Sequence, residues 1–279
     1  MIAFTKMQAV GNDFIVVRDA EAPSATWSAF AQSACERCRG IGADGLLVVG
    51  DGEHADAKVR MFNPDGTEDH CGNGMRCVVR FELDAGRAEI GRELRLETLA
   101  GIRTATIAGT HDDPRITIDM GEPRFSPAEI PMSVVVDPVV DYALDVEGES
   151  VRVTALSTGT THTVIFSDPA GIAERFDRLS PAISVHPVFP ERTSVLWVTV
   201  ESPERLSLRI WERGAGETLG CGTGACAAMV AARLHGYVGD RCVAASRGGE
   251  LTAEWTRSGP IWLTGTARTL FRGTYASTR

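Results

Sequence analysis

The sequence lacks the features that mark several large classes of protein. No apolar run approaches the span of a bilayer, and the opening stretch MIAFTKMQAVGNDF has no apolar core of signal-peptide length. Positive charge is scarce, with 28 Lys and Arg against 37 Asp and Glu, and no basic patch appears. Nucleic acids and anionic membrane surfaces are bound through basic patches. We therefore expect a cytoplasmic protein that binds neither nucleic acid nor membrane.

The chain also lacks a disulfide framework or a complete zinc motif. Its seven cysteines are an odd number, which fits free thiols in a reducing compartment. Cys35 and Cys38 form a C-x-x-C, but no second pair completes a metal site. Cys35 falls on the apolar face of a helix that Ser24 is expected to cap. A buried thiol is expected there, with no metal bound.

The most informative stretch is WERGAGETLGCGTGACAAMVAARLHG, residues 211–236. A β-like run ends, a glycine-rich loop carries Cys221, and a helix that is apolar on every side begins. Such a helix is predicted to be buried. Its first turn offers unpaired N–H groups and the positive end of the helix dipole. We therefore expect a lowered pKa for the Cys221 thiol and a role for it as a base.

A second cysteine in a glycine-rich loop before a helix occurs earlier in the chain. Cys71 begins the stretch Cys-Gly-Asn-Gly, which matches Cys-Gly-Thr-Gly at residues 221–224. The length allows two ordinary domains. We expect two pseudo-equivalent domains facing one cleft, with one cysteine each: residues 1–119 with a C-terminal strand at about 266–279, and residues 120–265. The proline-bearing segment 121–131 is the expected linker.

Short, partly alternating β-like runs separated by turns predict an α/β (α+β) fold with mainly antiparallel sheets. They favour antiparallel pairing over β-α-β crossovers. The expected strands before the linker are residues 2–7, 14–18, 46–49, 58–62, 94–98, 102–107 and 115–119.

The sequence closely resembles the diaminopimelate epimerases. The resemblance is carried by FTKMQAVGNDF at the start, GIGADG at 40–45, FNPDGTEDHCGNGMRC at 62–77, WERGAGETLGCGTGACA at 211–227 and GGELTAEW near the end. It implies two pseudo-symmetric halves, each a curved sheet around a central helix. It further implies an isomerase of lysine biosynthesis that converts LL- to meso-diaminopimelate without a cofactor. A homodimer is implied as well.

The resemblance also implies roles for individual residues. Cys71 and Cys221 would be the acid–base pair that inverts the α-carbon. The implied substrate-binding residues are Asn12, Gly45, Asn63, Gly72, Asn73, Thr160, His162, Ser194, Glu212, Arg213, Gly222 and Thr223. The chain departs from the family at Thr160 and Ser194, where asparagine is common, and Gly45 stands where some members have glutamine. A hydroxyl offers fewer hydrogen bonds than an amide, so the distal end of the substrate is in question.

Several alternatives remain open. A racemase of another amino acid, such as histidine, could use the same scaffold, and proline racemases and phenazine-pathway isomerases resemble the same fold. A thiol redox protein would use two facing cysteines as a disulfide. The glycines at 214–224 could form a nucleotide loop, although G-x-G-x-x-G spacing is absent from the first set, Glu217 would repel phosphate and no β-α-β pattern is expected around them.

Overall fold

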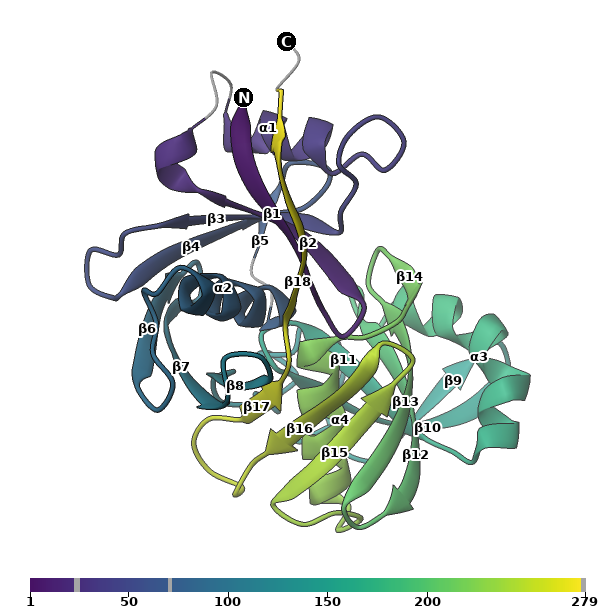
Figure 1. The fold of residues 1–279 in the computed structure, drawn as a ribbon. Helices are drawn as coiled ribbons and strands as arrows, with labels where there is room; N and C mark the ends of the chain where they lie inside the picture. Colours follow the sequence, from purple (N-terminus) through teal and green to yellow (C-terminus); the bar gives the residue numbers. More distant parts are fainter. Residues whose placement is uncertain (23–25, 70–71, 277–279) are drawn as a thin grey trace. The chain divides into compact units, whose positions relative to one another are not determined.

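The structure is a computed structural model that describes residues 1–22, 26–69 and 72–276 (Figure 1). The chain divides into two compact units, Met1–Asp119 with Thr264–Arg279, and Met120–Leu263. Each unit has its own buried apolar core. None of the helices in the described part of the chain is long and apolar enough to cross a membrane.

The first unit contains nine strands and two α-helices in its described part. They are β1 (Ile2–Ala9), β2 (Asn12–Arg18), α1 (Trp27–Ala34), β3 (Gly45–Gly50), β4 (Ala57–Phe62), β5 (Glu68–Asp69), α2 (Gly72–Asp84), β6 (Glu93–Thr98), β7 (Gly101–Gly109), β8 (Pro114–Asp119) and β18 (Arg268–Tyr275), with a short 3-10 helix at Asp19–Glu21. The final strand β18 pairs antiparallel with β1, with Tyr275 opposite Ile2, so both ends of the described chain share one sheet (Figure 1).

The second unit repeats this order of elements. They are β9 (Tyr142–Val146), β10 (Glu149–Ser157), β11 (Thr161–Phe166), α3 (Pro169–Ser184), β12 (Ser194–Ser202), β13 (Arg205–Glu212), β14 (Gly216–Thr218), α4 (Gly222–Leu234), β15 (Arg241–Ser246) and β16 (Gly249–Glu254). Strand β17 (Trp262–Gly265) spans the boundary between the units.

The strand pairings of the two units match. In the first unit, β1 and β2 are antiparallel, β2 and β3 are parallel across α1, and β4 and β6 are parallel across α2. In the second, β10 and β11 are antiparallel, β11 and β12 are parallel across α3, and β13 and β15 are parallel across α4. The expected mainly antiparallel fold is confirmed. The expectation of no β-α-β pattern around residues 211–236 is wrong, because α4 connects two parallel strands.

One side-chain pair is duplicated with the strands. Arg60 binds Glu68 through Nε and Nη2, both at 2.8 Å, between β4 and β5. Arg209 binds Glu217 in the same two-pronged way, at 2.9 and 3.2 Å, between β13 and β14. Each pair joins a very short strand, β5 or β14, to the longer strand beside it. Two parallel N–H···O bonds fix the carboxylate geometry as well as its charge.

Helix α1 shows where local sequence signals were misleading. Its cap is Thr26, which accepts a hydrogen bond from the Ala29 N–H at 3.2 Å. Ser24, the expected cap, lies outside the described residues. Cys35 is buried as expected, and burial raises the pKa of its thiol to about 12. Cys38 is exposed, so the buried-thiol expectation does not extend to it.

The segment 121–131 is packed into the second unit. Arg124 forms an antiparallel bridge with Ser157, and Ile130 is fully buried in the core of that unit. Its prolines therefore stand in a packed connection, which differs from the expected linker.

Helix α4 forms the centre of the second unit. Ten of its residues are buried, on every side, and it packs against β10–β13, β15 and β16 (Figure 1). The expected burial is thus confirmed. Alanines make this possible, because their small side chains let strands surround the helix closely while they cost no rotamer entropy.

Candidate active site

Cys221 is the N-cap of α4, the position directly before the helix begins. Its backbone is extended (φ −134°, ψ 118°), and its Sγ accepts a hydrogen bond from the Gly224 N–H at 3.3 Å. The sulfur takes the place that a serine or aspartate oxygen usually fills. Gly224 permits this approach, since a Cβ there would lie 3.0 Å from Leu196 Cδ2 and 3.3 Å from Sγ. The Cys-Gly-Thr-Gly sequence therefore places the Cys221 thiol at the N-terminus of α4.

Two polar side chains contact this thiol. Thr223 Oγ1 lies 3.3 Å from Sγ, and Glu212 forms a side-chain hydrogen bond with it. Burial raises the pKa of the Cys221 thiol well above its usual value, and the charge of Glu212 raises it further, although Thr223 and the Gly224 N–H lower it. The expected lowering of this pKa is therefore wrong. Burial and a carboxylate outweigh the helix N-terminus, and Cys221 is held as a neutral thiol.

Glu212 is itself held in place at the end of β13. Its Oε1 accepts a hydrogen bond from Thr218 Oγ1 of β14 at 2.5 Å. The short strand β14 pairs with β13, with Thr218 opposite Ile210. Thr218 of β14 thus orients the carboxylate of Glu212 toward the thiol.

His162 is fully buried near the start of β11. Its Nε2 forms a hydrogen bond with Thr160 Oγ1 at 3.0 Å. Burial, followed by the nearby charge of Arg213, lowers the pKa of His162 to about 3. The imidazole is neutral near pH 7, so His162 acts as a hydrogen-bonding group and cannot form an ion pair.

Ser194, at the start of β12, and Arg213, directly after β13, are joined by a hydrogen bond. The Arg213 N–H donates to Ser194 Oγ at 3.1 Å, and its Nη1 donates to the Glu191 carbonyl, also at 3.1 Å. Arg213 is exposed, so its positive charge is available to an anionic ligand. Both departures from the family pattern, Thr160 and Ser194, therefore use their hydroxyls to hold neighbouring site residues.

Strand pairing explains why these residues meet. His162 lies opposite Ser194 in the parallel pair β11 and β12, and Val195 lies opposite Trp211 in the antiparallel pair β12 and β13. The starts of β11 and β12 and the end of β13 therefore share one edge of the sheet. The N-terminus of α4 joins them through Thr158, whose Oγ1 donates to the Thr223 carbonyl at 3.0 Å. The structure thus brings together, in the second unit, the predicted residues Thr160, His162, Ser194, Glu212, Arg213, Cys221, Gly222 and Thr223.

In the first unit, Asn12 and Asn73 are brought together. Asn12 begins β2, and Asn73 is the second residue of α2 after Gly72. Asn73 Nδ2 donates to Asn12 Oδ1 at 2.6 Å. Cys71 lies outside the described residues, so its role stays a prediction.

Asn63 and Gly45 occupy neighbouring strand ends in the same unit. Asn63 follows β4 and is held in its own turn, where Nδ2 donates to Thr67 Oγ1 at 3.0 Å. Gly45 begins β3, and a Cβ there would lie 2.8 Å from Met61 Cε and 3.1 Å from the Phe62 carbonyl oxygen. A glutamine at this position would need the neighbouring atoms to move. The glycine therefore fits its close packing in this chain.

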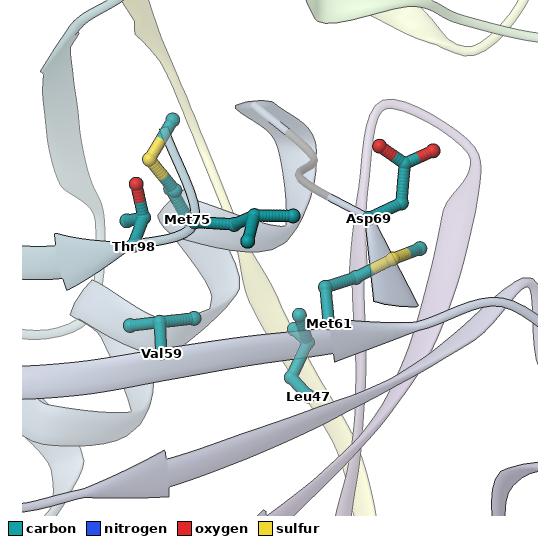
Figure 2. Close-up of a pocket in the computed structure, with 7 residues that line it drawn as sticks. Leu47, Val59, Met61, Asp69, Met75 and Thr98 are labelled. Atoms are coloured by element: carbon teal, nitrogen blue, oxygen red, sulfur yellow. The ribbon is translucent and has the colours of Figure 1, made fainter. Parts of the chain in front are cut away.

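Two pockets in the structure are lined, among the described residues, by none of these site residues. One, in the first unit, has a volume of about 10 Å³ and lies between Met61, Met75 and Asp69 (Figure 2). That volume suits a single water molecule and is far too small for an amino acid. The other, of about 240 Å³, lies against α3, β12 and β13 of the second unit.

Four polar residues beside these predicted residues were not expected from the sequence. Thr158 contacts Thr223, and no local pattern marks it; Thr218 contacts Glu212, and its place inside the stretch at 211–227 was a signal. Asp44 and Arg76 contact Asn12 and Asn73. Their positions inside the GIGADG and CGNGMRC stretches were the available signal.

The family model and the curated relatives agree on one family. The family model described as Diaminopimelate epimerase matches residues 4–126 and 154–270. A protein of Desulfitobacterium hafniense named diaminopimelate epimerase is 40% identical over 273 residues, covering 96% of each chain. One of Pelotomaculum thermopropionicum with the same name is 40% identical over 277 residues, covering 98% of each chain.

Solved structures share the fold at lower identity. A Bacillus anthracis phenazine biosynthesis protein of the PhzF family has a TM-score of 0.72 at 18% identity, covering 98% of this chain and 99% of its own. A hydroxyproline epimerase from Agrobacterium vitis has a TM-score of 0.70 at 17% identity, covering 98% and 91%. The α+β fold with two similar halves is therefore shared. With the full-length relatives at about 40% identity, the chain belongs to the diaminopimelate epimerase family of isomerases.

Proposed function

We propose that this protein interconverts LL- and meso-diaminopimelate by proton exchange between Cys71 and Cys221, without a cofactor. Family membership makes its substrate a small-molecule amino acid. The observation that carries the proposal is the buried Cys221 thiol at the N-terminus of α4, in contact with Glu212. Inversion needs a base on one face of the α-carbon and an acid on the other. Two like thiols can exchange these roles when the direction reverses.

The ionisation of Cys221 supports its assignment as the acid in one direction. The thiolate of Cys71 takes the α-proton, and the Cys221 S–H delivers its proton to the opposite face. Cys71 then ends as a thiol and Cys221 as a thiolate. A raised pKa also makes the Cys221 thiolate a stronger base in the reverse reaction, because base strength follows pKa. Glu212 is hydrogen-bonded to the Cys221 thiol, and this contact orients the sulfur in both the forward and the reverse reaction.

Loss of the α-proton places negative charge on the substrate carboxylate. Backbone N–H groups at the first turns of α2 and α4, at Gly72 and Gly222, are the proposed donors to this charge. Asn73 and Thr223 would add side-chain donors. Donors that are fixed before the reaction stabilise the transition state without reorganisation.

Thr160 and Ser194 bear on the distal end of the substrate. The Thr160 hydroxyl is already hydrogen-bonded to His162, and the Ser194 hydroxyl to Arg213. A distal substrate carboxylate that is buried with one hydrogen bond too few loses roughly 1.5–3 kcal/mol of binding free energy. We propose that Asn63 and Arg213 hold this end. The experiment compares kcat/KM for LL-diaminopimelate with single amino acids, histidine included, in native enzyme and a Thr160→Asn, Ser194→Asn variant.

The proposal predicts efficient turnover of LL-diaminopimelate by the native enzyme. Inert diaminopimelate in both proteins, with racemisation of another amino acid, would establish the alternative substrate. Turnover that appears only in the double variant would mean that the two departures have abolished activity on diaminopimelate.

We further propose that residues 1–119 with 266–279, and residues 120–265, are two half-domains with one catalytic cysteine each, and that the protein is a cytoplasmic homodimer. Leu270 and Phe271 of β18 are each about half exposed, and exposed apolar side chains often mark contact surfaces. Sedimentation equilibrium of the native protein tests the dimer. A monomer at micromolar concentration would refute it.

A further inference from the structure

A chain of hydrogen bonds in the first unit connects two charged residues through two site asparagines. Asn12 Nδ2 donates to Asp44 Oδ2 at 3.2 Å, and Asn73 Nδ2 donates to Asn12 Oδ1 at 2.6 Å. Arg76 Nη2 donates to Asn73 Oδ1 at the other end. Asn73 and Arg76 are almost fully buried. We call this chain, Asp44–Asn12–Asn73–Arg76, the amide relay.

The charged ends determine which way each amide points. An ionised carboxylate only accepts hydrogen bonds, and a guanidinium only donates them. Asp44 therefore requires the nitrogen of Asn12, which turns Oδ1 of Asn12 toward Asn73. Arg76 requires the oxygen of Asn73, which turns Nδ2 of Asn73 toward Asn12. The two ends impose the same polarity, so a flipped amide would place two acceptors or two donors together.

Asp44 is itself fixed by surrounding groups. Its Oδ1 accepts from Arg37 Nη2 at 2.6 Å, and its Oδ2 also accepts from the Asp13 N–H at 3.1 Å. Asp13 is bound by Arg37 and by the buried Lys6. Asp44, directly before β3, therefore keeps its bonds to the Asp13 N–H and to Asn12 even when Arg37 is removed.

We propose that Asp44 and Arg76 are positioning residues for the proton exchange, which fix the amide orientation of Asn12 and Asn73 through the amide relay. Each amide nitrogen carries a second N–H, and the relay aims it before substrate arrives. This inference rests on the proposed role of Asn12 and Asn73 as substrate donors. Fixed donors act in the transition state, so the effect belongs mainly in kcat.

A double-mutant cycle between Asp44 and Asn12 separates positioning from general structural support. Asp44→Ala is expected to lower kcat with LL-diaminopimelate by roughly tenfold to a hundredfold, with a smaller change in KM. In an Asn12→Ala background, the same change should cost no more than about twofold, because Asp44 then has no amide to orient. An equal loss in both backgrounds would overturn the inference.

Arg37→Ala is the matched control. It removes an ion-pair partner of Asp44 and Asp13 but touches neither asparagine, and Arg37 is largely exposed. Its kcat should remain within about threefold of native. A loss as large as that of Asp44→Ala would show that the charge cluster, and not the relay, matters. Thermal unfolding of each variant verifies that it is folded.

Side-chain amide NMR tests the relay without activity. Signals of Asn12 and Asn73 are assigned by their loss in the Asn12→Ala and Asn73→Ala variants. Asp44→Asn, which keeps the volume but loses the obligate acceptor, should shift the Asn73 signal although Asp44 does not touch Asn73. Arg37→Ala should leave the Asn73 signal in place. An unmoved Asn73 signal in Asp44→Asn refutes the relay, whereas a native enzyme inert on diaminopimelate refutes only the proposed function.

Discussion

At the scale of single residues, burial decides the ionisation of the second-unit site. Cys221 and His162 both stay neutral because each is removed from water, and the nearest charges, Glu212 and Arg213, push in the same direction. The sequence showed that Cys221 precedes a helix, which favours a thiolate. It could not show how deeply the thiol lies or that the carboxylate of Glu212 points at it.

The lowered pKa of His162 predicts that the stability of the protein depends on pH. Its pKa is about 3 in the folded protein against 6.5 as the ordinary value. Between these values the unfolded chain binds a proton that the folded protein does not, so stability falls as pH falls. The free energy of unfolding should drop by about 2 kcal/mol more between pH 7 and pH 5 in native protein than in His162→Gln. Urea unfolding at both pH values measures this, and equal drops would refute it.

Glu212 predicts a change in thiol reactivity. Glu212→Gln removes the negative charge that raises the pKa of Cys221, so more of the thiol should ionise at pH 8. The rate of iodoacetamide modification of Cys221, followed by peptide mass spectrometry, should therefore rise. At the same time kcat should fall, because the orienting carboxylate is lost.

Glu217→Gln is the matched control for that experiment. Glu217 lies near the same loop, where its carboxylate pairs with Arg209 and Arg247. The Glu217→Gln substitution should leave the rate of iodoacetamide modification of Cys221 near that of the native protein. Equal rates in all three proteins would mean that Glu212 does not govern this thiol.

At the scale of elements, alternation and turns predicted most strands but not their pairing. Strand ends near residues 94, 107 and 119 came within about two residues of the observed bounds. Parallel pairing of β2 with β3, or β13 with β15, depends on contacts distant in sequence, which local patterns do not carry. The two- and three-residue strands β5 and β14 are too short to show alternation at all.

The close packing at Gly224 predicts that the N-terminus of α4 does not tolerate a side chain at this position. In Gly224→Ala the new Cβ would press on Leu196 and on the Cys221 sulfur. We expect kcat to fall at least tenfold and the free energy of unfolding to fall by about 1–3 kcal/mol. Gly239→Ala is the control, since a Cβ there meets no atom within 4 Å. Kinetics and urea unfolding of both variants test this, and matching behaviour would contradict it.

At the scale of the whole molecule, duplication explains what the sequence could and could not predict. The repeated Cys-Gly-x-Gly stretches predicted two similar halves, and the structure repeats strand order, crossovers and the Arg–Glu pair. The predicted residues of the second unit lie together in the structure, and Glu212, Arg213, Cys221, Gly222 and Thr223 among them belong to one stretch of the sequence. Asp44 and Arg76 were missed because their importance comes from contacts with Asn12 and Asn73 that only the folded chain forms.

The central claim is inversion by two thiols, one from each half of the chain. The most direct measurement follows LL-diaminopimelate in deuterated water with native enzyme, Cys71→Ala and Cys221→Ala. Native enzyme should form meso-diaminopimelate carrying one solvent deuterium at the inverted carbon, with no loss of rate after chelation. Each variant should lose at least a hundredfold in rate, since no other group replaces the missing acid or base. Near-native conversion by either variant would contradict the account.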